Sequence, residues 1–316
     1  MKLNEITIEI TQQCTNRCIY CSSLSDMEKQ EALDFDVICE VVDDAIALGA
    51  TSISLSGGEP FLCDDIVRIV DYINSKGIKP RLYSGAIYCN NGHYSSIPKS
   101  LLEEIKDKLS ALIFNYETID AGLYATIMGT EPAYLTLLDD TIKSAITLNI
   151  LVEAHLVPMH CNYRQLPDVL DKLYSMGVTN VSFLRLVAQG RVLDNRNMVE
   201  LDNAEQQELI QILDACKHRY ADKIRLGLPF AAQRAACGTG TVKLTVRYDG
   251  FVFPCEAFKD GMMELSQGIK ADNVKNMRLK AIYEHSAYLH EVRDGLQVFS
   301  DSDCNEKCYG QYLRQE

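Results

Sequence analysis

Three cysteines near the N-terminus, Cys14, Cys18 and Cys21, are spaced C-x3-C-x2-C within the segment TQQCTNRCIYC. Three thiolates on one short loop can hold three irons of a four-iron, four-sulfide cube and leave the fourth iron open to a small molecule. A site with four cysteines would be closed instead. The run follows residues 6–10, which alternate apolar and polar side chains as a strand does. The loop could therefore carry an open cluster at the end of a first strand.

A second segment, SGGEP, directly follows another apolar strand pattern and contains Gly57, Gly58 and Glu59. Together, the cysteine run and this segment resemble the radical S-adenosylmethionine (radical SAM) superfamily. In that family, the cysteine loop carries a [4Fe-4S] cluster that binds S-adenosylmethionine (SAM), and the GGEP segment contacts the methionine amino group. The resemblance implies reductive cleavage of SAM to a 5′-deoxyadenosyl radical, which abstracts hydrogen from a substrate.

The bulk composition narrows the class of protein. The 316 residues are 47% hydrophobic, which suffices for a large buried core, and the formal net charge of -13 disfavours a nucleic-acid partner. We find no apolar run long enough to span a membrane and no signal peptide, so we expect a cytoplasmic protein. Twelve cysteines in a reducing compartment indicate metal or redox chemistry and not a disulfide framework.

Strand-like runs alternate with amphipathic helical stretches up to about residue 190. Strands are predicted near 5–10, 52–56, 80–84, 111–116, 151–158 and 180–186, and helices over 36–48, 65–75, 100–109, 136–148 and 166–176. Such units predict an α/β fold with parallel strands. Six of them fit a partial (β/α)6 TIM-like barrel, which is the usual radical SAM core, although the pattern alone also allows a doubly wound open sheet. In both, the chemistry lies at the carboxyl ends of the strands.

A different pattern follows, so we divide the chain into a core at 1–200 and a C-terminal extension at 201–316. The extension should contain a helix over 203–220, a hairpin around Asp249-Gly250, and a last helix over 274–294. It also contains a second cysteine group: Cys237, Cys255, Cys304 and Cys308. Four thiolates can close a cluster or a tetrahedral zinc site.

The segment YDGFVFPC, which ends at Cys255, resembles the twitch form of the SPASM extension. In that α+β extension, four cysteines hold one auxiliary [4Fe-4S] cluster. The full SPASM pattern has further cysteines for a second auxiliary cluster, whereas the C-terminal tail of this chain has only two cysteines. The resemblance thus implies one auxiliary cluster, and a structural zinc ion is the alternative.

Other cofactor contacts are suggested by the resemblance and by position. Tyr20, just before the last loop cysteine, is where the family often places an aromatic residue near adenine, although it could equally be a core tyrosine. The remaining candidates lie on or after later strands. Ser84 closes the third strand and could supply a hydroxyl contact to the cofactor, and Asn115 shares one face of the fourth strand with Glu117. Glu153 and His155 share a face of the fifth strand, which suggests a wet interior. Arg185 could pair with the methionine carboxylate or form an ordinary salt bridge, and Gly190 is expected near adenine.

Cys161 is a candidate catalytic residue because it follows the predicted fifth strand. Radical SAM epimerases use a cysteine to return a hydrogen atom to the substrate radical. Cys63 and Cys89 could do the same, but most free cysteines are inert packing residues. Cys39 and Cys216 fall inside predicted helices, where packing explains them.

Relatives with this extension mostly modify peptides or proteins, so we expect a peptide or protein substrate. A dehydrogenase or epimerase of a sugar or aminocyclitol is the second hypothesis. A non-catalytic iron–sulfur electron carrier is the third, although it would have no use for the GGEP segment. The enzyme would also need a reductant such as flavodoxin or ferredoxin.

Overall fold

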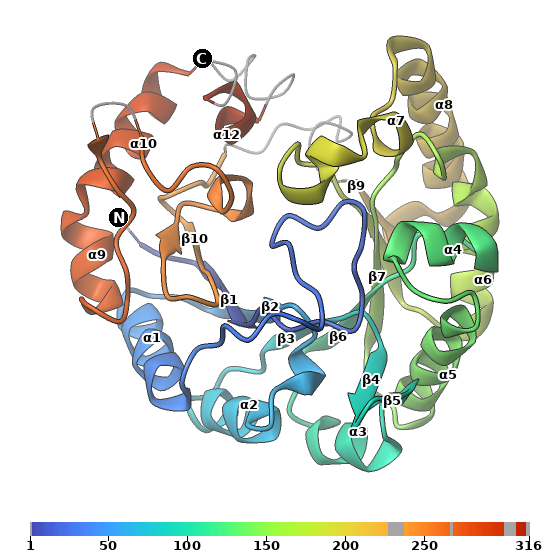
Figure 1. Ribbon diagram of the computed structural model, residues 1–316, viewed down its shortest axis with the longest axis horizontal. Helices are drawn as coiled ribbons and strands as arrows, with labels where there is room; N and C mark the ends of the chain where they lie inside the picture. Colours follow the sequence, from blue (N-terminus) through green and yellow to red (C-terminus); the bar gives the residue numbers. More distant parts are fainter. Residues whose placement is uncertain (1, 227–236, 266–267, 300–307, 314–316) are drawn as a thin grey trace. The chain divides into compact units, whose positions relative to one another are not determined.

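Figure 1 presents a computed structural model that describes residues 2–226, 237–265, 268–299 and 308–313. The chain forms two compact units. The first comprises Met1–Cys14, Ser25–Leu82 and Ala235–Glu316, and the second comprises Thr15–Leu24 and Tyr83–Arg234. Across the described residues, no helix combines the length and apolar character needed to cross a bilayer.

The sheet of the first unit is built around β1 (Glu5–Thr11), which pairs in parallel with β2 (Ser52–Gly57) and with β10 (Lys243–Val246). β3 (Arg81–Ser84) pairs in parallel with β2, and β11 (Val252–Phe253) closes a hairpin on β10. The alternating residues of β1 are buried at Ile6, Ile8 and Ile10. The predicted hairpin is therefore present, and its first strand joins the sheet of the N-terminal strands.

Helices of the first unit cover this sheet. α1 (Phe35–Ala47) packs against α2 (Ile66–Ser75) and α9 (Leu279–His285), and buries Ile38, Val41, Val42 and Ala45 at helical spacing (Figure 1). α10 (Ala287–Val298) follows, and a short α12 (Tyr309–Tyr312) ends the described chain. The single helix predicted over 274–294 is wrong. Ser286 leaves the helical conformation and its hydroxyl accepts from the Leu289 amide, which ends one helix and caps the next.

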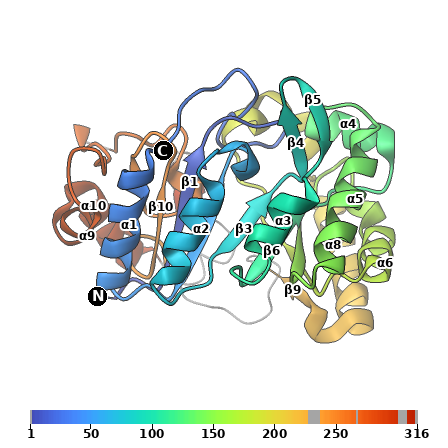
Figure 2. The same ribbon diagram turned by 90° about the horizontal axis from the view of Figure 1, so that it is seen from below.

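The second unit repeats strand and helix. Its strands β6 (Ala111–Asn115), β7 (Val152–Leu156), β8 (Asn180–Phe183) and β9 (Ile224–Leu226) are all parallel neighbours. α3 (Lys99–Ile105) precedes β6, and the helices between the strands are α4 (Ala121–Met128), α5 (Tyr134–Thr147), α6 (Leu166–Met176), α7 (Arg196–Val199) and α8 (Asn203–Tyr220). α6 packs against α8, and α3 and α4 pack against α5 (Figure 2).

The predicted core strands and helices are confirmed, with ends shifted by a few residues. A ribbon of β4 (Ile87–Asn90) and β5 (His93–Ser96), α4 and β9 were not predicted. The division at residue 200 does not follow the compact units, because the residues after 234 pack with the first two strands. The functional division into a core and an extension stays a prediction.

Candidate active site

The two glycines of the GGEP segment lie directly against the residues that lead into Cys14. The Gly58 amide donates to the Thr11 carbonyl at 2.6 Å, and the Glu59 amide donates to the Gln13 carbonyl at 2.8 Å. A methyl group on Gly58 would lie 2.0 Å from the Gln13 oxygen. Only glycine allows this approach, so the two sequence signals form one continuous backbone surface. The Glu59 carboxylate is fully buried and accepts from the Phe61 amide.

Cys18 and Cys21 share a tight turn in the second unit, where the Cys21 amide donates to the Cys18 carbonyl at 3.1 Å. The Arg17 and Ile19 amides donate to the last carbonyls of α4, and the Cys18 and Met128 sulfur atoms lie 3.8 Å apart. Burial raises the pKa of the Cys18 thiol, and the neighbouring Cys21 raises it further. The Arg191 guanidinium acts in the opposite direction and lowers this pKa.

Gly190, in the segment after β8, lies directly against the same cysteine turn. It has a φ of +57°, and a methyl group there would lie 2.3 Å from the Cys21 carbonyl oxygen. The next residue, Arg191, donates its amide to that oxygen at 3.1 Å and its guanidinium to the Cys18 carbonyl at 3.4 Å. Gly190 therefore contacts the cysteine loop, and its predicted contact with adenine remains a prediction.

Tyr20 and Glu117 form a buried pair beside the cysteine turn. The Tyr20 hydroxyl donates to Glu117 Oε1 at 2.8 Å, and Asn115 Nδ2 donates to the same oxygen at 3.4 Å. The Val157 amide donates to Oε2 at 2.9 Å. Burial raises the pKa of Glu117 to about 7, although these hydrogen bonds lower it. Burial and the adjacent carboxylate raise the pKa of Tyr20 well above its usual value. Asn115 and Glu117 thus share one face, as predicted.

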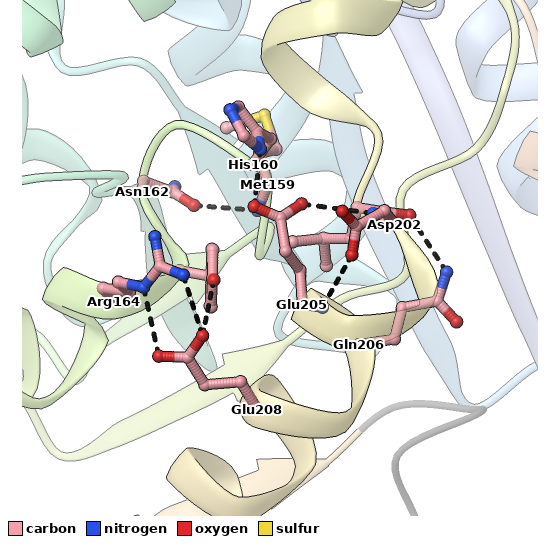
Figure 3. A network of polar contacts seen from close by, with 10 residues as sticks. Met159, His160, Asn162, Arg164, Asp202, Glu205, Gln206 and Glu208 are labelled. Carbon is pink, nitrogen blue, oxygen red and sulfur yellow. Dashed lines mark hydrogen bonds and ion pairs between the residues drawn. The ribbon is translucent and has the colours of Figure 1, made fainter.

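The loop after β7 is tied to this pair by Asn162, which is 1% exposed. Its Nδ2 donates to the carbonyls of Glu117 at 3.0 Å and Val157 at 3.2 Å, and its Oδ1 accepts from the Met159 amide at 2.8 Å. Figure 3 shows the amide directed at Met159. One side chain therefore fixes two strand-end loops relative to each other.

The same loop is held from outside by the start of α8 (Figure 3). Asp202 caps the helix by accepting from the Glu205 amide, and the Glu205 carboxylate accepts from the Asp202 amide. The other oxygen of Glu205 lies 2.7 Å from His160 Nδ1. The helix cap thus positions the imidazole that precedes Cys161.

The other predicted contacts also lie at strand ends of the second unit. Ser84 is buried and its hydroxyl accepts from the Ala86 amide. Arg185 has a buried Nη2 with no hydrogen-bond partner among the described residues. Glu153 Oε2 lies 3.0 Å from Arg225 Nη1, so this carboxylate is part of an ion pair. His155 packs edge-on against Tyr83, with ring centroids 5.2 Å apart.

Cys161 lies close enough to Glu117 for that carboxylate to act on it. Burial raises the pKa of the Cys161 thiol to about 11, and Glu117 contributes in the same direction. Burial also raises the pKa of Cys63, which follows the 3-10 turn at Pro60–Leu62. Cys89 lies on β4, and Cys39 and Cys216 lie in α1 and α8 as predicted.

The second cysteine group lies in the first unit. The Gly240 amide donates to the Pro254 carbonyl at 3.0 Å, which joins the turn after Cys237 to the residue before Cys255. Cys308 raises the pKa of Cys255, so the two thiols are near neighbours, and the Tyr309 ring packs on Phe258. Cys304 lies outside the described residues. Three of the four predicted thiols therefore belong to one region.

Lys243 supplies positive charge to this region. Burial raises the pKa of Cys255 to about 12, although the Lys243 ammonium and the Thr239 hydroxyl lower it. Burial acts to lower the pKa of Lys243, but Glu256, Cys255 and Cys237 outweigh it. Glu256 also accepts from the Thr7 hydroxyl at 2.9 Å, which fixes the carboxylate.

Among the residues that the structure describes, no three His, Cys, Asp and Glu side chains converge as a ready-made metal site. The fit of iron–sulfur clusters therefore rests on the donors and their surroundings. Thiolates are the ligands that such clusters use. Gly58 and Gly190 allow close backbone contact at the first cysteine loop, and the half-buried Lys243 lies beside the second cysteine group. Both groups suit a cluster.

Three residues that hold the loops of the second unit were not singled out from the sequence: Arg191 and Asn195 at the first cysteine loop, and Asn162 at the loops after β6 and β7. The Asn195 amide donates to the Ile19 carbonyl at 3.4 Å. All three act on backbone carbonyls far away in the chain. No periodicity or spacing marks such contacts, so the sequence holds no signal that could have found them.

Residues 8–132 match the profile of the radical SAM superfamily. The chain is 24% identical to the PqqA peptide cyclase of Methylobacterium nodulans over 292 residues, which cover 90% of this chain and 74% of that protein. Across the matched PqqA peptide cyclases, the shared segment spans 65% to 74% of their length. A probable GTP 3′,8-cyclase of Methanococcus maripaludis is 20% identical, with 91% of this chain and 97% of that protein covered.

Solved structures share the fold. Streptococcus suis SuiB bound to S-adenosylmethionine superposes with a TM-score of 0.76 at 16% identity, with 99% of this chain and 74% of that chain covered. SuiB bound to its precursor peptide SuiA gives the same TM-score at 17% identity, with 99% and 73% covered. The predicted α/β partial barrel is thereby confirmed, and the doubly wound open sheet is not adopted. Residues 8–132 of the chain are therefore similar to the radical SAM superfamily, and the chain shares the fold of SuiB.

Proposed function

We propose that this enzyme modifies a peptide or protein by radical chemistry, with a [4Fe-4S] cluster held by Cys14, Cys18 and Cys21. When bound, the cluster supplies the electron that cleaves S-adenosylmethionine and so generates the radical that abstracts a substrate hydrogen atom. The contact of Gly58 and Glu59 with the backbone just before Cys14 carries the proposal. It joins the two sequence signals of this chemistry in one surface.

The protein's own groups would bind and orient SAM. Gly57, Gly58 and Glu59 form the wall for the methionine amine. The buried Nη2 of Arg185, which has no hydrogen-bond partner among the described residues, suits an incoming carboxylate. Asn115 and Ser84 are the last residues of β6 and β3, and Tyr20 lies in the cysteine loop, where they can contact the nucleoside. Their low exposure would keep water away from the reacting bond.

We further propose one auxiliary [4Fe-4S] cluster held by Cys237, Cys255, Cys304 and Cys308. The nearness of three of these residues supports it, and a structural zinc ion is the competing occupant. Metal analysis separates them. Equal amounts of iron and sulfide in excess of the four of each that one cluster per chain requires support the proposal. One zinc ion per chain together with iron for only one cluster contradicts it.

A peptide substrate is favoured by the relatives, since a PqqA peptide cyclase and a precursor-peptide-binding SuiB share the sequence pattern or the fold. A reductant such as flavodoxin or ferredoxin would deliver the electron. We also infer a cytoplasmic location, because many unpaired cysteines suit a reducing compartment.

The experiment is anaerobic incubation of the reconstituted protein with SAM and dithionite, followed by mass spectrometry of 5′-deoxyadenosine. Short peptides encoded beside the gene, and sugars or aminocyclitols, are tested as substrates. Peptide-dependent deoxyadenosine with a mass-shifted or epimerised peptide supports the proposal. Cys18→Ala should abolish product, whereas Cys39→Ala in α1 should retain it. No deoxyadenosine under any condition favours the electron carrier.

Cys161 supports a second outcome, epimerisation. Its raised pKa keeps the sulfur protonated at neutral pH, which hydrogen-atom donation requires. The S–H hydrogen would pass to a carbon radical of the substrate, leaving a thiyl that the external reductant returns to a thiol with one electron and one proton. Cys161→Ala should lose the epimer while still forming deoxyadenosine. Unchanged epimer formation by that variant would remove the residue from the mechanism.

A further inference from the structure

The buried charges of the first unit are nearly all paired. Lys259 Nζ lies 2.5 Å from Glu9 Oε1, with side chains 7% and 2% exposed. Arg247 Nη2 lies 2.6 Å from Asp249 Oδ2. Pairing is expected because an unpaired buried charge loses its hydration without compensation. A cation in this unit that lacks a partner therefore needs an explanation.

Arg293, on α10, is such a cation. It is 4% exposed, and its Nε donates to the Gly240 carbonyl at 2.6 Å. Its Nη1 and Nη2 are buried and have no hydrogen-bond partner among the described residues. The guanidinium carbon lies 4.6 Å from the Tyr283 ring centroid, which compensates only part of the lost hydration. An arginine stays charged in proteins, so an anion is missing here.

The position of Arg293 indicates where that anion belongs. Its Nε is bonded to Gly240, whose amide is bonded to Pro254, the residue before Cys255. The Arg293 Cγ lies 3.7 Å from where a methyl group on Gly240 would stand, and Cys237 lies three residues earlier in the chain. The guanidinium thus adjoins the turn that links two of the auxiliary cysteines.

Burial acts to lower the pKa of Lys243, the other nearby cation, and the Glu256 carboxylate acts to raise it, so this cation already has a carboxylate beside it. Arg293 has no carboxylate among the described residues. It is the group left to balance negative charge brought in by thiolates and sulfides.

We propose that Arg293 is the counter-cation of the auxiliary cysteine site and stabilises the reduced state of the cluster held there. The inference rests on the proposed auxiliary cluster. On reduction, one electron passes from the reductant to the cluster, no bond forms or breaks, and the site becomes more negative. A fixed cation favours that state, and the net charge around a cluster is a main determinant of its potential.

The test is an EPR-monitored redox titration with dithionite of the full-length protein carrying Cys14→Ala, Cys18→Ala and Cys21→Ala, so that only the auxiliary cluster remains. Arg293→Leu should lower the one-electron reduction equilibrium constant at least tenfold, which corresponds to about 59 mV. Arg293→Lys should recover most of the shift. Arg278→Leu is the control, because that arginine is half-exposed and already paired with Asp44. Iron content and circular dichroism identify any variant that fails to fold.

The outcomes separate the two proposals. A parent protein without auxiliary iron, or with zinc in its place, overturns the auxiliary cluster and this inference with it. A fully loaded Arg293→Leu protein with an unchanged potential overturns only the role of Arg293.

Discussion

Gly58→Ala tests the contact on which the proposed active site depends. The added methyl group would lie 2.0 Å from the Gln13 oxygen and 2.6 Å from the Gln12 oxygen. Ordinary contact begins at 3.4 Å, so the two backbone segments must separate by roughly 1.4 Å. That shift would break the amide hydrogen bonds that Gly58 and Glu59 donate to the strand leading into Cys14.

The expected cost follows from these two effects. Overpacking against backbone costs about 1–3 kcal/mol, and each lost hydrogen bond costs about 1 kcal/mol. We expect Gly58→Ala to reduce the free energy of unfolding by roughly 3 kcal/mol. Iron bound at the first cysteine loop should fall as well, because the residue before Cys14 is displaced.

Urea unfolding of the metal-free protein, followed by circular dichroism, measures the stability loss, and iron analysis after reconstitution measures the loading. Gly77→Ala is the matched control. That glycine has a φ of +84° and nothing within 4 Å, so alanine there should cost only about 1 kcal/mol from backbone strain. Equal losses in the two variants would refute the reasoning, since the close contact would then contribute nothing.

Three further changes test other parts of the molecule. Burial raises the pKa of Glu117 to about 7, so the folded protein binds this proton more tightly than the unfolded chain does, and the free energy of unfolding should fall by on the order of 3 kcal/mol as pH rises from about 4.5 to 7. Glu117→Gln should remove this pH dependence, as measured by urea unfolding at several pH values. An unchanged pH dependence would contradict the assignment. Asn162→Leu should lower the free energy of unfolding by about 3 kcal/mol, because three buried backbone groups lose their partner. Asn203→Ala, at an exposed position, should leave it nearly unchanged. Similar urea midpoints for the two variants would count against the bridging role of Asn162. Lys259→Met should lower the free energy of unfolding by about 3–5 kcal/mol, because it leaves Glu9 charged and buried without its partner. Adding Glu9→Gln should restore much of that stability. A double variant that is no more stable than Lys259→Met alone would argue against this ion pair.

The sequence predicted the core elements because their signals are local. Alternation marked β1, and spaced apolar residues marked α1, whose buried face matches the pattern. The GGEP segment and the cysteine loop were recognisable because their residue types and spacing are short-range. Asn162 and the contact of Gly190 with the cysteine loop could not be found this way, since both depend on carbonyls more than forty residues away that only the folded chain brings near.

The predicted last helix failed for a related reason. Its apolar spacing continues across Ser286, and only the hydroxyl bond to the Leu289 amide distinguishes a cap from a helix interior. The ribbon of β4 and β5 was missed because neither four-residue strand has a buried face with clear alternation.

Parallel pairing of β1 with both β2 and β10 has a consequence for dissecting this protein. A chain cut before residue 235 would leave one side of β1 as a bare edge of unpaired amide and carbonyl groups. Such an edge invites pairing between molecules, so truncated material should aggregate even though it retains the first cysteine loop. The tail thus protects the strand that leads to Cys14.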